Sequence, residues 1–350
     1  MSVSRTDLRP GYSISRIIKG GWQLAGGHGS FDRQQAVDDM LRFVDNGITT
    51  FDCADIYTGV EEMIGDAVKQ LRQRDGGPVE ERIQVHTKLV PDLDSLSTIT
   101  HRDIEAIIDR SLKRLNLEQL HLVQFYWWDL SLGDPLASLD VLKTLRDKGK
   151  IRYLGCTNWD QSAMQGFVDK DFDMVSAQVQ YSLLDHRPAG AFSQWCSDND
   201  IRILCYGVLA GGFLTDRWLG QPDPGFAFEN RSLIKYRLII EDFGGWDLFQ
   251  ALLETLADIG RQQGVPLSAV ATSYMLQQPQ VAATIIGART AANIGNTLAS
   301  AAVCLDESQN ASIEAVTSQR RGPLGNVYAL EKDRNGPHGR IMKYNLNAPQ

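Results

Sequence analysis

The stretch ITTFDCADIYTGVEEMIGDAVKQLRQ, residues 48–73, holds one complete strand and one complete helix. Residues 48–52 are apolar and β-branched, which is typical of a buried strand, and residues 60–73 have the apolar spacing of an amphipathic helix. Asp52 ends the expected strand, and Tyr57 lies in the loop before the expected helix. Folds built from such units gather functional side chains at their strand ends, so this loop is a candidate site.

The same alternation of strand and helix runs through the chain. Further strands are expected at 14–18, 83–88, 121–126, 151–155, 174–179, 201–206 and 281–286, and further helices at 33–46, 101–115, 136–148, 160–168, 188–199, 247–263 and 290–302. Eight strand–helix units without a linker-like break predict one (β/α)8 TIM barrel over residues 1–350, with its core at about 14–303. A doubly wound sheet is the competing fold, but the chain has no G-x-G-x-x-G motif.

Two segments fall outside this alternation. Residues 207–246 form a long loop after the seventh strand, and residues 322–350 form a C-terminal tail rich in glycine and charge. Long loops in a barrel are usually functional or disordered. The tail has apolar groups at 327–330 and 341–344, so we expect part of 323–345 to cover the pocket or a neighbouring subunit.

Composition and charge exclude several classes of protein. The chain of 350 residues has a formal net charge of −8, which argues against a nucleic-acid binder. No apolar run reaches the roughly 18 residues of a membrane helix, which predicts no membrane span. The five cysteines are scattered without a C-x-x-C pair, which favours reduced thiols in the cytoplasm and no metal site. The sequence leaves open whether the protein is a monomer or a homo-oligomer.

Asp52, Tyr57 and Lys88 are candidates for a general-acid unit. Lys88 ends the third expected strand, so a barrel brings it to the same end as Asp52. A phenol has an ordinary pKa of about 10, and a cation beside it favours the phenolate and eases proton donation. A carboxylate beside the lysine would hold that lysine charged and in place. Tyr126 ends the fourth strand at the same end of the barrel.

These residues also carry a resemblance to a known family. FDCADIYTGVEEMIGDAV (51–68) resembles the aldo-keto reductase signature, and GKIRYLGCTNW (149–159) is similar to a second segment of that family. The resemblance covers roughly residues 14–303. It implies reversible reduction of an aldehyde, ketone or sugar carbonyl by NADPH, with NADH as the alternative, without a metal. It also implies that Tyr57 is the general acid and base, tuned by Lys88 and Asp52.

The resemblance further implies which residues bind the cofactor. Thr157, Asn158 and Gln178 would hold the nicotinamide carboxamide, and Tyr206 would stack on the nicotinamide ring. The full expected set is Gly21, Thr157, Asn158, Gln178, Tyr206, Gly207, Leu209, Gly211, Gly287, Arg289 and Asn293.

The segment IIGART (285–290) matches the part of the family that holds the adenosine phosphate. Arg289 could reach a 2′-phosphate there, which favours NADPH. The helix expected to start at Thr290 would offer free backbone N–H groups to an anion. Asn293, in contrast, stands where the family often has a basic residue.

One catalytic position departs from the family. The family has a histidine at the end of strand four, where Tyr126 stands here within VQFYWWD (123–129). A phenol is a larger and weaker acid than imidazole, yet it can still donate one hydrogen bond to a carbonyl. Trp22, Trp127 and Trp128 are the expected substrate-binding residues, and the core is the alternative place for the last two.

Tyr126 leaves two other functions open. Potassium-channel β subunits share the barrel of this family and replace the same histidine, so a cofactor-binding regulatory subunit with little turnover is one alternative. A lyase or isomerase chemistry that retains the cofactor is the other. The intact set of Asp52, Tyr57 and Lys88 favours the reductase, with a small-molecule carbonyl compound as its substrate.

Overall fold

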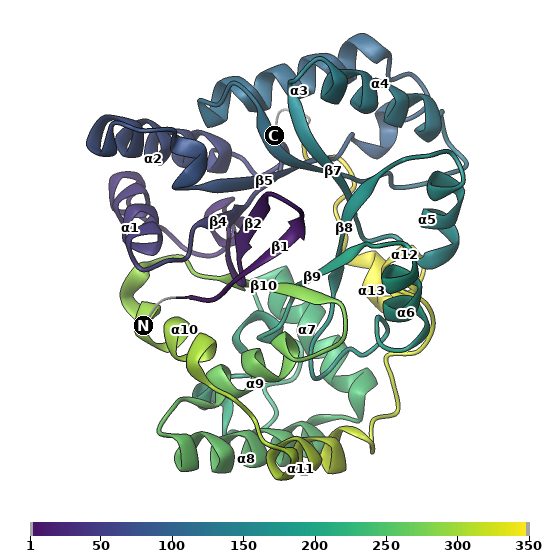
Figure 1. Cartoon of the computed structure of the whole chain (residues 1–350). Coiled ribbons are helices and arrows are strands. Elements are labelled where there is room, and N and C mark those ends of the chain that lie inside the picture. Colours follow the sequence, from purple (N-terminus) through teal and green to yellow (C-terminus); the bar gives the residue numbers. More distant parts are fainter. Residues whose placement is uncertain (1–2, 348–350) are drawn as a thin grey trace.

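Eight parallel strands close into a barrel in the computed structural model, which describes residues 3–347 (Figure 1). Around the barrel the strands are hydrogen-bonded in the order β10–β3–β4–β5–β6–β7–β8–β9. Their bounds are β3 Ile17–Gly20, β4 Thr50–Asp52, β5 Gln84–Leu89, β6 Leu120–Phe125, β7 Ile151–Thr157, β8 Met174–Gln180, β9 Arg202–Tyr206 and β10 Val281–Gly287. The predicted (β/α)8 TIM barrel is confirmed.

Helices surround the barrel on its outside (Figure 1). The eight that match expected helices are α1 Arg33–Asp45, α2 Val60–Asp75, α3 His101–Leu115, α4 Pro135–Asp147, α5 Gln161–Val168, α6 Ala191–Asp198, α8 Trp246–Gln263 and α10 Ile294–Ala302. The last of them begins four residues later than predicted, because Thr290 caps a separate 3-10 turn, Ala291–Asn293. Among residues 3–347, no helix has the length and apolar character needed to span a bilayer.

Five helices of residues 3–347 lie outside the predicted set: α7 Arg231–Phe243, α9 Leu267–Leu276, α11 Glu307–Thr317 and the two one-turn helices of the tail described below. α9 is buried over nearly its whole surface, so its apolar residues have no helical periodicity to detect. α7 lies in the long loop after β9 and begins where the Asn230 side chain accepts a hydrogen bond from Ser232 N. α11 follows the barrel and begins with a capping box formed by Asp306 and Gln309.

A hairpin closes one end of the barrel. β1 (Arg5–Arg9) pairs antiparallel with β2 (Tyr12–Ser15), and Figure 1 shows the pair across the barrel opening. The strand expected at 14–18 is therefore wrong as a single element, because the chain leaves β2 at Ser15 and enters β3 at Ile17. Arg16 fills the break, and its guanidinium donates to the carbonyl oxygens of Val281 and Ala282.

The strand register carries the predicted acid unit to the opposite end of the barrel. Asp52 is the last residue of β4 and lies beside His86 of β5, and Lys88 follows two residues later. Side chains alternate along a strand, so His86 and Lys88 share the inner face. The Tyr12 hydroxyl, from the hairpin, lies 2.9 Å from His86 Nε2. The hairpin therefore closes one end of the barrel, and the acid unit lies at the other end, with His86 between them.

The tail, residues 322–347, folds back over the barrel end that carries the acid unit, and it is yellow in Figure 1. It contains two one-turn helices, α12 Ala329–Lys332 and α13 Pro337–Arg340. His338 Nε2 lies 2.8 Å from Asp242 Oδ2 near the end of α7. Further along, Leu93 N, in the loop after β5, donates to Tyr344 O over 3.0 Å. The second half of the tail is thus tied to the body of the barrel at two points.

Candidate active site

The acid unit is assembled at the carboxyl ends of β4 and β5. Lys88 Nζ lies 2.7 Å from Asp52 Oδ1 and 2.7 Å from the carbonyl oxygen of Cys53. The same ammonium lies 5.2 Å from the centre of the Tyr57 ring. Asp52 and Lys88 are 5% and 6% exposed, so their ion pair is largely shielded from water. The structure therefore brings together the three residues that the strand ends predicted.

Burial changes the expected acidity of the phenol. It raises the pKa of Tyr57 to about 12, and the nearby charge of Lys88 opposes this rise without cancelling it. Burial by itself lowers the pKa of Lys88, but Asp52 and Tyr57 outweigh burial and leave that pKa above its ordinary value. In this state Tyr57 is a neutral phenol and Lys88 is an ammonium ion. The tyrosine thus holds its proton next to a fixed positive charge.

Two amide side chains support Asp52 from inside the barrel. Gln178 Nε2 donates to Asp52 Oδ1 over 2.6 Å, and Gln124 Nε2 approaches the same oxygen at 3.5 Å. Thr157 Oγ1 in turn lies 3.3 Å from Gln178 Oε1. The sequence assigned Gln178 to the cofactor alone and did not include Gln124. Gln124 lies two residues before Tyr126 on the same, inner face of β6, and this spacing could have identified Gln124 from the sequence.

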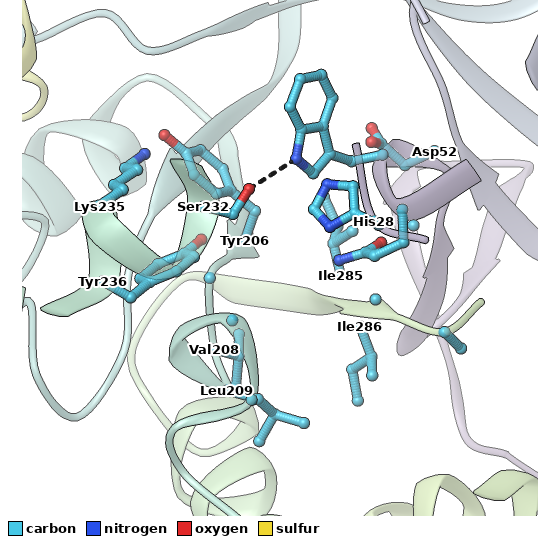
Figure 2. A pocket seen from close by; sticks show the side chains of 18 of the residues that line it. His28, Asp52, Tyr206, Val208, Leu209, Ser232, Lys235, Tyr236, Ile285 and Ile286 are labelled. Atoms are coloured by element: carbon cyan, nitrogen blue, oxygen red, sulfur yellow. Dashed lines mark hydrogen bonds between the residues drawn. The ribbon is translucent and has the colours of Figure 1, made fainter. Parts of the chain in front are cut away.

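A pocket of about 900 Å³ opens above the acid unit, near the upper end of the ~300–1,000 Å³ typical of ligand sites. Figure 2 shows it from close by, with Asp52 on one side and Tyr206, Lys235 and Tyr236 on the other. Six lysine or arginine residues line the pocket and only two aspartates, although the chain as a whole carries a net charge of −8. The pocket therefore suits an anionic ligand. The six cations are Lys88, Arg217, Arg231, Lys235, Arg289 and Lys343.

Ten of the eleven expected cofactor residues line this pocket. The Tyr206 hydroxyl donates to Asn158 Oδ1 over 2.8 Å, which joins the expected stacking ring to an expected carboxamide ligand. Gly21 is the exception: it lies behind the pocket wall, where an added Cβ would meet Asp52 O at 2.8 Å. The ten residues are Thr157, Asn158, Gln178, Tyr206, Gly207, Leu209, Gly211, Gly287, Arg289 and Asn293.

Local backbone and polar groups shape one wall of the pocket. Gly207 and Gly211 have positive φ angles of 72° and 64°, and a Cβ on either would come within 2.7 Å of the Tyr236 ring or hydroxyl. Glycine is thus required for the chain to follow the pocket wall at these points. Gln23 Oε1 is buried in the same wall, and no residue in the 3–347 range supplies it with a hydrogen-bond donor. A ligand amide could supply that donor.

Two loops meet across the pocket. Trp22 Nε1 donates to Ser232 Oγ over 3.0 Å, the contact that the dashed line marks in Figure 2. Asn230 Nδ2 donates to Gly27 O over 3.0 Å, so the loop after β3 and the start of α7 are joined at a second point. Arg289 contacts the carbonyl oxygen of His28 on the same loop. Trp22, an expected substrate residue, thus lines the pocket and joins these two loops.

The aromatic residues after β6 divide between pocket and core. Tyr126 and Trp128 line the pocket, with ring centres 4.8 Å apart and edge to face. Trp127 takes the core position that the sequence left open as its alternative, because it is 1% exposed, stacks on Phe125 and does not line the pocket. Its Nε1 donates to Leu132 O over 2.9 Å. Alternation explains this outcome, since the residue after an inward-facing one faces outward.

The tail supplies pocket residues that the sequence did not name individually. Tyr328, Ile341, Met342, Lys343 and Leu346 line the pocket. Within residues 3–347, no cluster of three or more His, Cys, Asp or Glu side chains is arranged to hold a metal ion.

Comparison with known proteins agrees with this geometry. A sequence profile of the aldo/keto reductase family matches residues 16–318. The aldo-keto reductase YhdN of Bacillus subtilis is 29% identical over 233 residues, which cover 64% of this chain and 66% of that protein. The NADH-specific methylglyoxal reductase of Escherichia coli is 28% identical over 233 residues, with 63% and 71% covered. The chain thus spans about two thirds of the length of these relatives.

Solved structures share the fold at lower identity. An aldo-keto reductase from Klebsiella pneumoniae in complex with NADPH superposes with a TM-score of 0.68 and 20% identity, covering 93% of this chain and 99% of that one. The glycerol dehydrogenase of Gluconobacter oxydans gives a TM-score of 0.72 and 22% identity, covering 89% and 94%.

The barrel, the acid unit at its strand ends and the cationic pocket define the class of NAD(P)H-dependent oxidoreductases built on a TIM barrel. Since the family profile spans most of the chain, the protein belongs to the aldo/keto reductase family.

Proposed function

We propose that this protein reduces the carbonyl group of a small aldehyde, ketone or sugar to an alcohol, with NADPH as the reductant and Tyr57 as the acid. The observation that carries the proposal is the position of Lys88 Nζ, 2.7 Å from Asp52 Oδ1 and 5.2 Å from the Tyr57 ring centre. This arrangement holds a proton donor and a permanent cation at the wall of a pocket of ligand size.

The nicotinamide cofactor, when bound, supplies the hydride. Tyr57 donates its proton to the carbonyl oxygen as negative charge develops there. Lys88 stabilises the phenolate that remains, and Asp52 keeps Lys88 charged and oriented. In the reverse direction the phenolate takes the proton from the alcohol. Tyr126 is proposed to orient the carbonyl by donating one hydrogen bond to its oxygen.

The proposed cofactor preference is for NADPH. Arg289 lies at the pocket edge in the loop after β10, and Thr290 caps the turn that follows it, so a cation and a helix start are available to a phosphate. NADH remains the alternative, because one relative is named as an NADH-specific reductase. Thr157, Asn158 and Gln178 are proposed to hold the carboxamide, and Tyr206 to stack on the ring.

The proposed substrate is small and largely uncharged. Trp22, Tyr57, Tyr126 and Trp128 supply aromatic surface around the acid unit, and Asp52 is already occupied by Lys88. Such a wall fits a carbonyl compound with an apolar or sugar-like body. We also propose that the protein acts in the cytoplasm, which its five free cysteines support.

The test combines cofactor binding with turnover. NADPH fluorescence is titrated with wild-type protein and with Tyr57→Phe, and both are assayed against a panel of aldehydes, ketones and sugars. We expect equal NADPH affinity and a kcat at least about 100-fold lower in Tyr57→Phe, because the proton donor is absent. Full activity in that variant would exclude Tyr57 as the acid.

A second candidate is a cofactor-binding regulatory protein with little turnover, and Tyr126 favours it. The same measurements separate the two functions. Tight NADPH binding without oxidation by any carbonyl on the panel would favour the regulatory protein. Oxidation that depends on an added carbonyl and on Tyr57 would favour the reductase.

A further inference from the structure

The tail brings a second phenol, Tyr328, beside Tyr126. Tyr328 is 4% exposed and lines the pocket beside Tyr126, with ring centres 6.1 Å apart and planes at 83°. Burial raises the pKa of both phenols, so both hydroxyl groups at this wall of the pocket keep their protons at neutral pH. Tyr126 also contacts Trp128, so this phenol is held between one residue of the barrel and one of the tail.

The number of hydroxyl protons limits how many hydrogen bonds a pair of phenols can donate. Tyr126 and Tyr328 together carry two hydroxyl protons, and a hydrogen bond between them uses one. The other proton is free for an acceptor in the pocket, whichever tyrosine holds it. A hydroxyl that accepts one hydrogen bond becomes a stronger donor in the next, because the chain polarises. The pair can therefore serve as one donor stronger than an isolated phenol.

The backbone at Tyr328 is held in a conformation that a tyrosine rarely adopts. Its φ angle is 62°, in the left-handed region, where a bulky residue is a genuine outlier. Such strain persists when neighbouring contacts fix the position, and it gathers at functional sites. The observed strain thus marks Tyr328 as a position that the surrounding structure enforces.

The contact that fixes this part of the tail lies three residues after Tyr328, at Glu331 in α12. Arg187, in the loop after β8, donates to both carboxylate oxygens of Glu331 over 2.9 and 3.1 Å. Arg187 also binds Asp185 over 2.7 and 2.9 Å, and Lys235 Nζ lies 4.0 Å from Glu331. The side chains of Arg187 and Glu331 are 2% and 0% exposed. Two cations and two carboxylates balance here, so the tail is fixed by a charge-neutral buried cluster.

We propose that Tyr328 is a substrate-binding residue that acts with Tyr126 as one hydrogen-bond donor to the substrate carbonyl, and that Glu331 is its positioning residue. The proposal deepens the proposed function and rests on it. The pair stands where the family has a single histidine, and half of it comes from the tail. Carbonyl orientation in this protein then depends on a docked tail.

The test uses steady-state kinetics at saturating NADPH with the best carbonyl from the panel. Tyr126→Phe and Tyr328→Phe should each lower kcat/KM at least about 10-fold, since each removes one member of the donor pair. The double variant should fall no further than the worse single variant, within about three-fold, because the two residues form one unit. NADPH affinity should stay at the wild-type value in all three. Tyr344→Phe is the matched control, as it removes a tail hydroxyl that donates to Gly339 O outside the pocket, and its kcat/KM should stay within two-fold.

Tyr328→His adds a second variant, because histidine tolerates positive φ and retains a donor. It should keep more activity than Tyr328→Phe, and equal losses would overturn the donor role. Glu331→Gln should lower kcat/KM in the wild-type background and should have no further effect in the Tyr328→Phe background. Independent, multiplying effects, or a Tyr328→Phe variant with wild-type kcat/KM, would overturn this proposal alone. A wild-type protein that reduces no carbonyl would overturn the proposed function and this proposal with it.

Discussion

Gln178 donates a 2.6 Å hydrogen bond to Asp52, on the same carboxylate oxygen that receives Lys88 at 2.7 Å. The residue expected to bind the nicotinamide carboxamide is therefore also a direct support of the acid unit. Cofactor binding and proton donation share one side chain, and a change at Gln178 reaches both.

Gln178→Leu keeps the approximate size of the side chain and removes both amide groups. We expect weaker NADPH binding and, at saturating NADPH, a kcat about 10-fold lower, because Asp52 loses its shortest amide contact. Fluorescence titration and single-turnover assays measure the two effects separately. Gln194→Leu, on the exposed face of α6, is the control. A raised Kd with unchanged kcat would limit Gln178 to the cofactor.

Lys88→Met removes the cation and leaves Asp52 buried without its partner. Breaking a buried pair in this way costs about 3–5 kcal/mol of unfolding free energy, and activity should fall at least about 100-fold. Urea unfolding and steady-state assays measure both. Adding Asp52→Asn should restore much of the stability and none of the activity. Recovery of activity in the double variant would contradict the role given to Lys88.

The pH profile of carbonyl reduction should be flat from about pH 6 to 10. Tyr57 has a pKa of about 12 and burial raises the pKa of Tyr126, so neither phenol loses its proton in this range. Tyr126→His should introduce an inflection near the imidazole pKa of about 6.5. The measurement is kcat/KM against pH at saturating NADPH. An inflection near pH 6.5 in the wild-type protein would contradict the assignment.

Arg289→Leu should weaken the binding of NADPH but not the binding of NADH. If the guanidinium meets the 2′-phosphate, NADPH affinity should fall at least about 10-fold, the value of one charge-assisted contact, and NADH affinity should hardly change. Fluorescence titration with both cofactors measures this. Arg261→Leu, an exposed arginine on α8, is the control. Equal losses for both cofactors would place Arg289 on a phosphate that the two share.

Acid should loosen the contact between Glu331 and Arg187. Burial raises the pKa of Glu331, but Lys235 and Arg187 outweigh it and lower the pKa to about 2, against an ordinary 4.5. A lowered folded-state pKa contributes stability above pH 4.5 that disappears as pH falls toward 2, here about 3 kcal/mol. Urea unfolding should find Glu331→Gln less stable than wild type at pH 7, with the gap closing between pH 4.5 and 2. Glu307→Gln, an exposed control, should show no such gap.

The barrel was predictable because each strand–helix unit carries its own periodicity, and the acid unit followed from residues at neighbouring strand ends. α9 was not predictable from the sequence, since burial on every side removes the pattern that identifies a helix. Trp127 and Trp128 could not be divided between pocket and core beforehand, because a sequence does not tell which of two adjacent tryptophans faces inward. The place of Tyr328 depends on a contact between Arg187 and Glu331, 144 residues apart, which no local pattern encodes.

The closed hairpin end of the barrel has a practical consequence for handling the protein. β1 begins at Arg5 and lies across the end away from the acid unit, whereas Leu346 lines the pocket itself. An affinity tag or a fused domain is therefore best joined at the N-terminus. A domain fused close behind Leu346 would lie beside the pocket opening and could hinder the entry of cofactor and substrate.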